Sequence, residues 1–308
     1  RHIVTLGCAL LTLILVFGIC MHSPSAIIET LNIHSIFSPG FWHTAGEASE
    51  ASAGINWETI VFIAGMMIMV EGMALSGFFS WLCLTIAKAV RYNTTKIFIM
   101  FMILAFVLSM FIDSITVILF LAAITITQSK LLQFDPIPVI IAEIFCSNLG
   151  GSSTMCGDPP NIIIGTALHY TFTDFLTNTG VIAIICLVLM IFFFYMCFRI
   201  KLGKRNLSEE EIEKMPTPQS AITNKRAFII STVIFLCAVI LLVTHGQTGL
   251  TVSTIGIIAA AATCITAGKK SKAILRRVDY PTLVFFTGLF VVVGGLEETG
   301  ILELIATF

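Results

Sequence analysis

Residues 147–161 read Ser-Asn-Leu-Gly-Gly-Ser-Ser-Thr-Met-Cys-Gly-Asp-Pro-Pro-Asn, a polar and glycine-rich stretch between two apolar ones. Apolar sequence precedes it from Ile137 to Phe145 and follows it from Ile162 to Leu168. Irregular backbone at the depth of a membrane is tolerated only where protein buries it or where it lines a watery cavity. Broken helices of this kind hold the ion and substrate sites of secondary transporters. The stretch therefore predicts a broken transmembrane helix over 137–168.

The composition is that of a membrane protein. Hydrophobic residues make up 57% of the chain and charged residues 11%, against roughly 25% charged residues in a soluble domain. A helix of about 20 apolar residues crosses a bilayer. The clearest long runs are Ile3–Met21, Thr59–Val70 with its continuation to Val90, Gly180–Phe198, Ala227–Thr244 and Thr251–Ala267. We therefore predict an all-α polytopic membrane protein in a lipid bilayer. The sequence shows no surface of basic residues interleaved with aromatic ones, so we expect no nucleic-acid partner. The nine cysteines are scattered and form no CxxC pair, so we expect no bound metal or cofactor on their account.

The seventeen Lys and Arg residues can all be placed on one side of the membrane. They fall at Arg1, in Lys88–Lys96, at Lys130, in Arg199–Arg226 and in Lys269–Arg277. By the positive-inside rule we expect these loops to be cytoplasmic. If the protein is prokaryotic, the membrane is expected to be the plasma (inner) membrane. The assignment requires that 97–128 enters and leaves on the same side, as a re-entrant hairpin with its tip near Asp113.

Two segments match each other at a constant shift of 223 residues, Thr59–Gly65 with Thr282–Gly288, and the match continues through three further identities. Under the topology above the two copies cross the membrane in opposite directions, which is the inverted-topology repeat of many transporters. The chain opens at Arg1 and stops at Phe308 inside an apolar run, so we expect it to be part of a longer protein. The expected units are a first repeat over 1–200, a cytoplasmic linker over 201–226 and a truncated second repeat over 227–308.

Ionisable side chains inside a span cost about 2.5–3.5 kcal/mol on insertion scales and so indicate function by default. Asp113, with Ser114 and Thr116, offers hard oxygen ligands that suit Na⁺, or a carboxyl group that carries a proton. The alternative is that Asp113 only caps the next helix. Glu143, one turn before the break, is a candidate proton relay or a partner for a neighbouring helix.

At the break, carbonyl groups of the first half-helix face a cation, and N–H groups of the second half, which begins at Pro159, face an anion. Asp158 is placed to cap the second half, with ion coordination as its second role. The predicted ion and substrate site comprises Asp113, Ser114, Thr116, Ser147, Asn148, Gly150, Gly151, Ser152, Ser153, Thr154, Asp158 and Asn161, with Asp113 and Asn148 as candidate Na⁺ ligands.

Residues 148–164 resemble the signature of ArsB/NhaD-type permeases of the ion transporter superfamily, which includes arsenite efflux proteins, Na⁺/H⁺ antiporters, the melanosomal P protein and citrate transporter-like domains. Three further segments resemble the family as well: Trp57–Thr59, Phe111–Thr116 and Ala142–Glu143. The family usually has Asp-Asn at the hairpin tip, where this chain has Asp113-Ser114. The resemblance implies an inverted-repeat fold and a homodimer. It also implies a scaffold domain and a mobile domain with two hairpins and two broken helices, of which only the first pair falls within this chain.

The leading hypothesis is a secondary active transporter of a small inorganic ion by alternating access, either in arsenite or anion efflux or in Na⁺/H⁺ antiport. A citrate or dicarboxylate carrier coupled to Na⁺ or H⁺ is an alternative, and so is a passive anion channel. An intramembrane aspartyl protease would use two buried aspartates, one in the pair Gly157-Asp158. However, Met155 stands where the protease motif needs glycine. We therefore expect no enzymatic activity.

Overall fold

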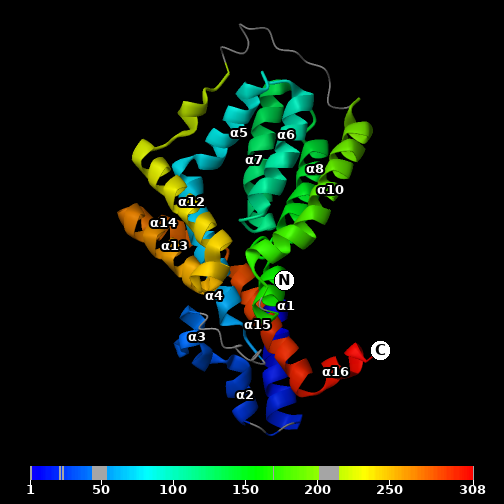
Figure 1. Ribbon diagram of the computed structural model, residues 1–308, viewed down its shortest axis with the longest axis vertical. Coiled ribbons are helices and arrows are strands. Elements are labelled where there is room, and N and C mark those ends of the chain that lie inside the picture. Colours follow the sequence, from blue (N-terminus) through cyan, green and yellow to red (C-terminus); the bar gives the residue numbers. More distant parts are fainter. Residues whose placement is uncertain are drawn as a thin grey trace.

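The computed structural model describes residues 2–20, 22, 24–43, 54–168, 170–200 and 215–307. Within these ranges the chain is almost entirely helical (Figure 1), and seven helices are long and apolar enough to cross a membrane. The predicted all-α polytopic class is confirmed. The helical elements are α1 (His2–Leu11), η1 (Thr12–Cys20), α2 (Pro24–Leu31), η2 (Ile33–Phe37), α3 (Pro39–Trp42), α4 (Trp57–Ser76), α5 (Phe78–Ala89), α6 (Thr94–Ser109), α7 (Ser114–Leu132), α8 (Pro136–Ser152), α9 (Pro159–Ala167), α10 (Phe172–Phe198), η3 (Pro218–Ala221), α12 (Lys225–Thr248), α13 (Val252–Ala267), η4 (Gly268–Lys270), α14 (Ser271–Arg277), α15 (Tyr280–Glu298) and α16 (Ile301–Ala306).

The apolar run that continues from Thr59 to Val90 is two helices, α4 and α5, rather than one. Gly77 separates them with a φ of 89°, in the left-handed region. Glycine adopts this conformation at no steric cost, whereas a side chain would be strained there. The backbone carbonyl of Ala221 also lies against Gly77 and leaves no room for a Cβ. The turn between α4 and α5 therefore depends on this glycine.

The two segments that match at a shift of 223 residues share their local construction. Asn56 caps α4 by accepting from the Thr59 N–H at 2.9 Å, and Asp279 caps α15 by accepting from the Thr282 N–H at 3.3 Å. Gly300, 223 residues after Gly77, also has a positive φ, of 72°. Each segment is thus a capped helix that ends near a left-handed glycine and leads into another helix.

Helices α4 and α15 run in opposite directions. Gly294, near the end of α15, lies against Gly54, just before α4 begins. At the other end of α4, Gly72 faces Ile274 of α14, the helix that leads into α15. In addition, α4 packs against α12 and α13, whereas α15 packs against α1 and α2. These features are what an inverted repeat requires, and the repeat itself stays a prediction.

Helices α6 and α7 form a hairpin. Its tip lies at residues 110–113, and Lys96, near the start of α6, and Lys130, near the end of α7, lie at the ends away from the tip. The break predicted over 137–168 is present, because α8 and α9 are separated by residues 153–158. Helix α8 packs against α6, α7 and α10 to form the upper bundle in Figure 1. This bundle positions the hairpin tip beside the break.

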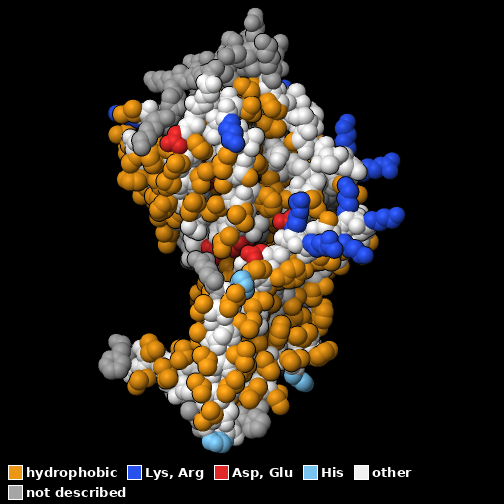
Figure 2. Space-filling model, turned by 180° about the vertical axis from the view of Figure 1, so that it is seen from behind, with side chains coloured by type: hydrophobic (Ala, Val, Ile, Leu, Met, Phe, Trp, Pro, Cys, Tyr) orange, Lys and Arg blue, Asp and Glu red, His pale blue; other side chains and the backbone are white. Residues whose placement is uncertain are grey.

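The loop between η1 and α4, residues 22–56, contains three short helices, α2, η2 and α3, in its described part. Residues 44–53 of that loop and 201–214 of the predicted linker lie outside the described residues. On the face shown in Figure 2, hydrophobic side chains cover both halves of the molecule, and Lys and Arg gather in the upper half. Exposed apolar side chains in such number suit a surface that faces lipid.

Candidate ion site at the hairpin tip and the helix break

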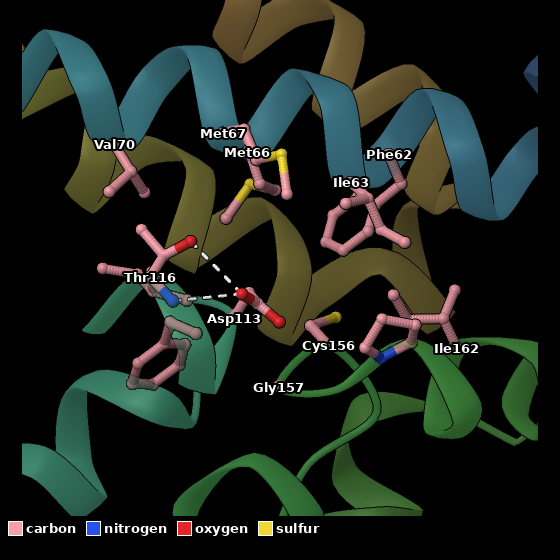
Figure 3. A pocket seen from close by; sticks show the side chains of 13 residues that line it. Phe62, Ile63, Met66, Met67, Val70, Asp113, Thr116, Cys156, Gly157 and Ile162 are labelled. Atoms are coloured by element: carbon pink, nitrogen blue, oxygen red, sulfur yellow. Dashed lines mark hydrogen bonds between the residues drawn. The ribbon is translucent and has the colours of Figure 1, made fainter. Parts of the chain in front are cut away.

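Asp113 is the last residue of the hairpin tip and the N-cap residue of α7. Its Oδ2 atom accepts hydrogen bonds from the Thr116 N–H at 3.1 Å and from the Thr116 hydroxyl at 3.2 Å. The capping role that the sequence left open is therefore present. The other carboxyl oxygen points away from Thr116, toward Cys156 and Gly157 of the break (Figure 3). Capping thus uses one oxygen of Asp113 and leaves the other directed at the break.

Asp158 occupies the N-cap position of α9, but its side chain makes no capping hydrogen bond. Pro159 and Pro160 have no N–H to offer, and the Asn161 N–H bonds to the Asp158 carbonyl at 3.1 Å. Oδ1 of Asp158 instead accepts from the Ser114 hydroxyl at 2.8 Å. The expected capping bond is therefore absent, and this end of α9 offers few donors for an anion.

Buried hydroxyl groups join the hairpin to the break. Ser147 bonds to the Ser109 hydroxyl and donates to the Ser114 carbonyl at 3.1 Å. Thr154 donates to the Met110 carbonyl in the tip. Since Ser109, Ser114, Ser147 and Thr154 are all buried, these bonds fix the two elements against each other.

The break itself is closed by its own polar groups. The Asn161 amide donates to the carbonyls of Gly151 at 3.1 Å and Thr154 at 2.9 Å, so α9 is tied back to the end of α8. Ser153 donates to the Gly150 carbonyl. Gly151 lies against the Asp158 carboxylate, and Gly150 lies so close to the Phe106 carbonyl of α6 that a Cβ would overlap it.

A small cavity lies between α4 and this assembly (Figure 3). Its volume is about 20 Å³, which is room for about one water molecule or one small ion. Asp113 and Thr116 line it from the hairpin, and Gly157 and Pro159 line it from the break. The wall formed by α4 is apolar and consists of Phe62, Ile63, Met66, Met67 and Val70.

The charge around this cavity is negative. Asp113 lines it, Asp158 lies between two residues that line it, and the two carboxyl groups repel each other through space. Lys, Arg and His do not occur among the residues that line the cavity. Two carboxyl groups that share a site favour the uptake of a proton or another cation. The described lining of the cavity is thus acidic and carries no basic side chain.

Three predicted residues lie apart from this cluster. Asn148 is exposed on α8 and does not line the cavity, so the structure does not bring it to Asp113. Ser152 is exposed and donates to the Leu149 carbonyl of its own helix. Glu143 is buried between α7 and α8, where the Thr125 hydroxyl donates to it at 2.6 Å.

The sequence reasoning missed Ser109, Thr125 and Gln128. Each is a buried polar residue on an apolar helix of the hairpin. Their polar side chains within apolar runs are the feature by which the sequence could have indicated them. The α4 wall was also missed, because nothing in the sequence places α4 across the tip.

Comparison with known proteins extends this result. The family model described as citrate transporter matches residues 3–308. An uncharacterized transporter of Mycobacterium tuberculosis is 28% identical over 257 residues, which are 81% of this chain and 58% of that protein. Magnetosome protein MamN of Magnetospirillum gryphiswaldense is 29% identical over 257 residues, 82% of this chain and 58% of that protein. Human P protein is 37% identical over 142 residues, 45% of this chain and 17% of that protein.

The chain thus spans about 58% of the length of the bacterial relatives it matches. The family model covers nearly the whole chain, and seven described helices can cross a membrane. The resemblance drawn from the sequence is confirmed at this level, while the arsenite and antiporter branches stay proposals. The chain is an integral, multi-pass membrane protein and belongs to the citrate transporter family of the ion transporter superfamily.

Proposed function

We propose that the protein is a secondary active transporter and that the hairpin tip and helix break form half of the site for its coupling cation, Na⁺ or H⁺. The observation that carries this proposal is the Asp113 carboxyl group at a cavity that no basic residue lines, with the Asp158 carboxyl group close enough to act on Asp113 electrostatically. A cavity with room for about one water molecule suits a small ion better than an organic substrate.

The transported partner is best taken as a small carboxylate such as citrate, because the matching family model is described as a citrate transporter. Na⁺/H⁺ antiport is the second candidate, and the acidic character of the described half-site favours it. Efflux of arsenite or another anion through the N-terminus of α9 is less favoured, because two prolines remove donors there.

We place the Lys- and Arg-rich loops on the cytoplasmic side, following the positive-inside rule, and we propose a homodimer in the plasma membrane. Alternating access suits the construction, because hydrogen bonds make the tip and the break one unit. That unit faces the apolar wall of α4 without a hydrogen bond to the residues that form the wall. A unit that its own hydrogen bonds hold together, and that makes no hydrogen bond to the neighbouring wall, can move as a rigid body.

The test is flux into liposomes that contain the purified protein, with labelled citrate, a dicarboxylate, arsenite and Na⁺ supplied in turn. We expect an inward Na⁺ or H⁺ gradient to drive citrate above its equilibrium concentration. Antiport would instead appear as a Na⁺ gradient that moves protons without any anion. Anion movement that follows only its own gradient would mean a passive channel and would overturn the proposal.

A further inference from the structure

A second buried carboxyl group lies away from the tip, between α7 and α8. Glu143 has 0% of its surface exposed. One oxygen, Oε1, accepts from the Thr125 hydroxyl of α7 at 2.6 Å. The other, Oε2, has no hydrogen-bond partner among the described residues. Half of a buried carboxyl group is thus left without a partner.

Gln128 lies one turn beyond Thr125 on α7 and is only 3% exposed. Neither its amide oxygen nor its amide nitrogen has a hydrogen-bond partner within the described chain. Buried polar groups are nearly always hydrogen-bonded, and each exception calls for an explanation. Here three unpartnered atoms lie on α7 and α8, two helices that pack together, within one helical turn along the chain of the bonded residues Thr125 and Glu143. This is the environment in which a buried water molecule is held by several polar groups.

The surroundings of Glu143 do not neutralise a negative charge. The titratable groups that face it are the thiols of Cys83 on α5 and Cys146 on α8. No Lys or Arg of the described helices forms an ion pair with it. An unpaired carboxylate in an apolar interior is very costly, so the site requires either a bound proton or a bound cation.

A proton fits the available groups better than a metal ion. Hard metal cations collect about six or more oxygen ligands. Glu143, Gln128 and Thr125 together offer fewer, and no cluster of metal-binding side chains occurs in the described part of the chain. A proton needs only the carboxyl group, with the Thr125 hydroxyl and a water molecule to complete its hydrogen bonds.

The position of Glu143 connects the two ends of the hairpin. Gln128 and the buried Ser129 lie on the side of Lys130, at the end of α7. In the other direction Ser147 follows Glu143 by one turn on α8. Ser147 bonds to the backbone of Ser114, whose hydroxyl bonds to Asp158. Polar side chains thus recur about one helical turn apart on α7 and α8, between the end of the hairpin and its tip.

We propose that Glu143 is a proton-binding site that serves the tip, with a water molecule held by Gln128 on its path from the Lys130 end of the hairpin. Proton binding converts the carboxylate to the neutral acid, and release returns the proton along the same groups. The binding of a proton at Glu143 does not depend on which ion is transported. Only the transfer of that proton to the hairpin tip rests on the proposed function.

The first test is infrared difference spectroscopy of the protein in lipid, between alkaline and acidic pH. We expect a carboxylic-acid C=O band that disappears in Glu143→Gln. Thr125→Val should shift this band to higher frequency because the C=O group loses its donor, whereas Thr125→Ser should leave it in place. Asp135→Asn, at an exposed helix cap, should not change it. A spectrum unaffected by both Glu143→Gln and Thr125→Val would overturn the proposal.

The second test separates a proton from a metal ion and binding from transport. Replacing K⁺ by Na⁺ should leave the Glu143 band unchanged, and a band removed by Na⁺ would overturn the proton assignment. In liposomes, Glu143→Gln should shift the pH profile of flux, and a pH profile identical to that of the unsubstituted protein would overturn its service to the tip. If the unsubstituted protein shows no coupled flux, the proposed function fails, yet the infrared band still decides whether Glu143 binds a proton.

Discussion

The Ser114 hydroxyl donates a hydrogen bond to Asp158 Oδ1 at 2.8 Å, joining the first residue of α7 to the residue before α9 across 44 positions of the chain. Asp158 is free to accept this bond because it does not cap its own helix. The bond therefore directs the carboxyl group of an N-cap residue toward the hairpin tip instead of toward its own helix. It is also the direct side-chain link between the two carboxyl-bearing elements of the site.

Ser114→Ala should weaken both the fold and the site. A hydrogen bond to a charged group contributes about 1.5–3 kcal/mol, and the substitution removes the hydroxyl donor of Asp158 while it keeps the backbone N–H of residue 114. We expect a lower thermal midpoint in detergent and reduced coupled flux. Ser152→Ala is the matched control, because Ser152 is exposed and bonds only to its own helix. Equal effects of the two substitutions would show that the bond to Asp158 has no special role.

Gly150→Ala should destabilise the protein by about 1–3 kcal/mol, the usual range for an overpacked core. The added Cβ would meet the Phe106 backbone, which cannot move aside as a flexible side chain can. The measurement is the denaturation midpoint of purified protein. In Gly7→Ala the new Cβ meets no atom within 4 Å, and a change of similar size there would contradict the packing argument.

Asn161→Ala should loosen the break, because it removes both amide bonds to the carbonyls of Gly151 and Thr154. Each lost bond costs about 0.5–1.5 kcal/mol. The buried thiol of Cys156 should then react faster with a maleimide, as followed by mass spectrometry of the labelled peptides. Cys83, buried elsewhere, is the internal control. No change in the Cys156 rate would mean that Asn161 does not hold the break closed.

The hairpin predicts that residues 96 and 130 face the same side of the membrane, because they lie at the same end of α6 and α7. In a background without native cysteines, Lys96→Cys and Lys130→Cys should both react with an impermeant reagent from one side only. We expect that side to be the cytoplasm. Labelling of the two positions from opposite sides would exclude a re-entrant hairpin.

The sequence predicted those parts of the site that depend on local chemistry. Proline at the start of α9, glycine beside the break and Asp113 at the tip each have one strong local preference. The hairpin and the break followed from the placement of polar residues and charges in an apolar chain. These features were therefore predictable without tertiary information.

The remainder depends on which helices meet. That Asp158 accepts from Ser114, and that α4 closes the cavity, follows from packing between segments far apart in the sequence. Asn148 is exposed although Ser147 beside it is buried, because successive residues of a helix point in different directions. Which of the two faces the hairpin depends on how α8 is turned about its axis. The split at Gly77 was missed because an apolar run with glycine reads equally well as one long span.

Asp113→Asn tests the central claim most directly. Asparagine caps helices about as well as aspartate, so α7 should keep its start and the protein its thermal midpoint, while the site loses a charge. Asp135→Asn makes the same change at the exposed cap of α8 and is the control. The measurement is uptake driven by a Na⁺ or H⁺ gradient in liposomes. The account predicts that Asp113→Asn abolishes gradient-driven uptake and that Asp135→Asn preserves it. Full gradient-driven uptake by folded Asp113→Asn protein would contradict it.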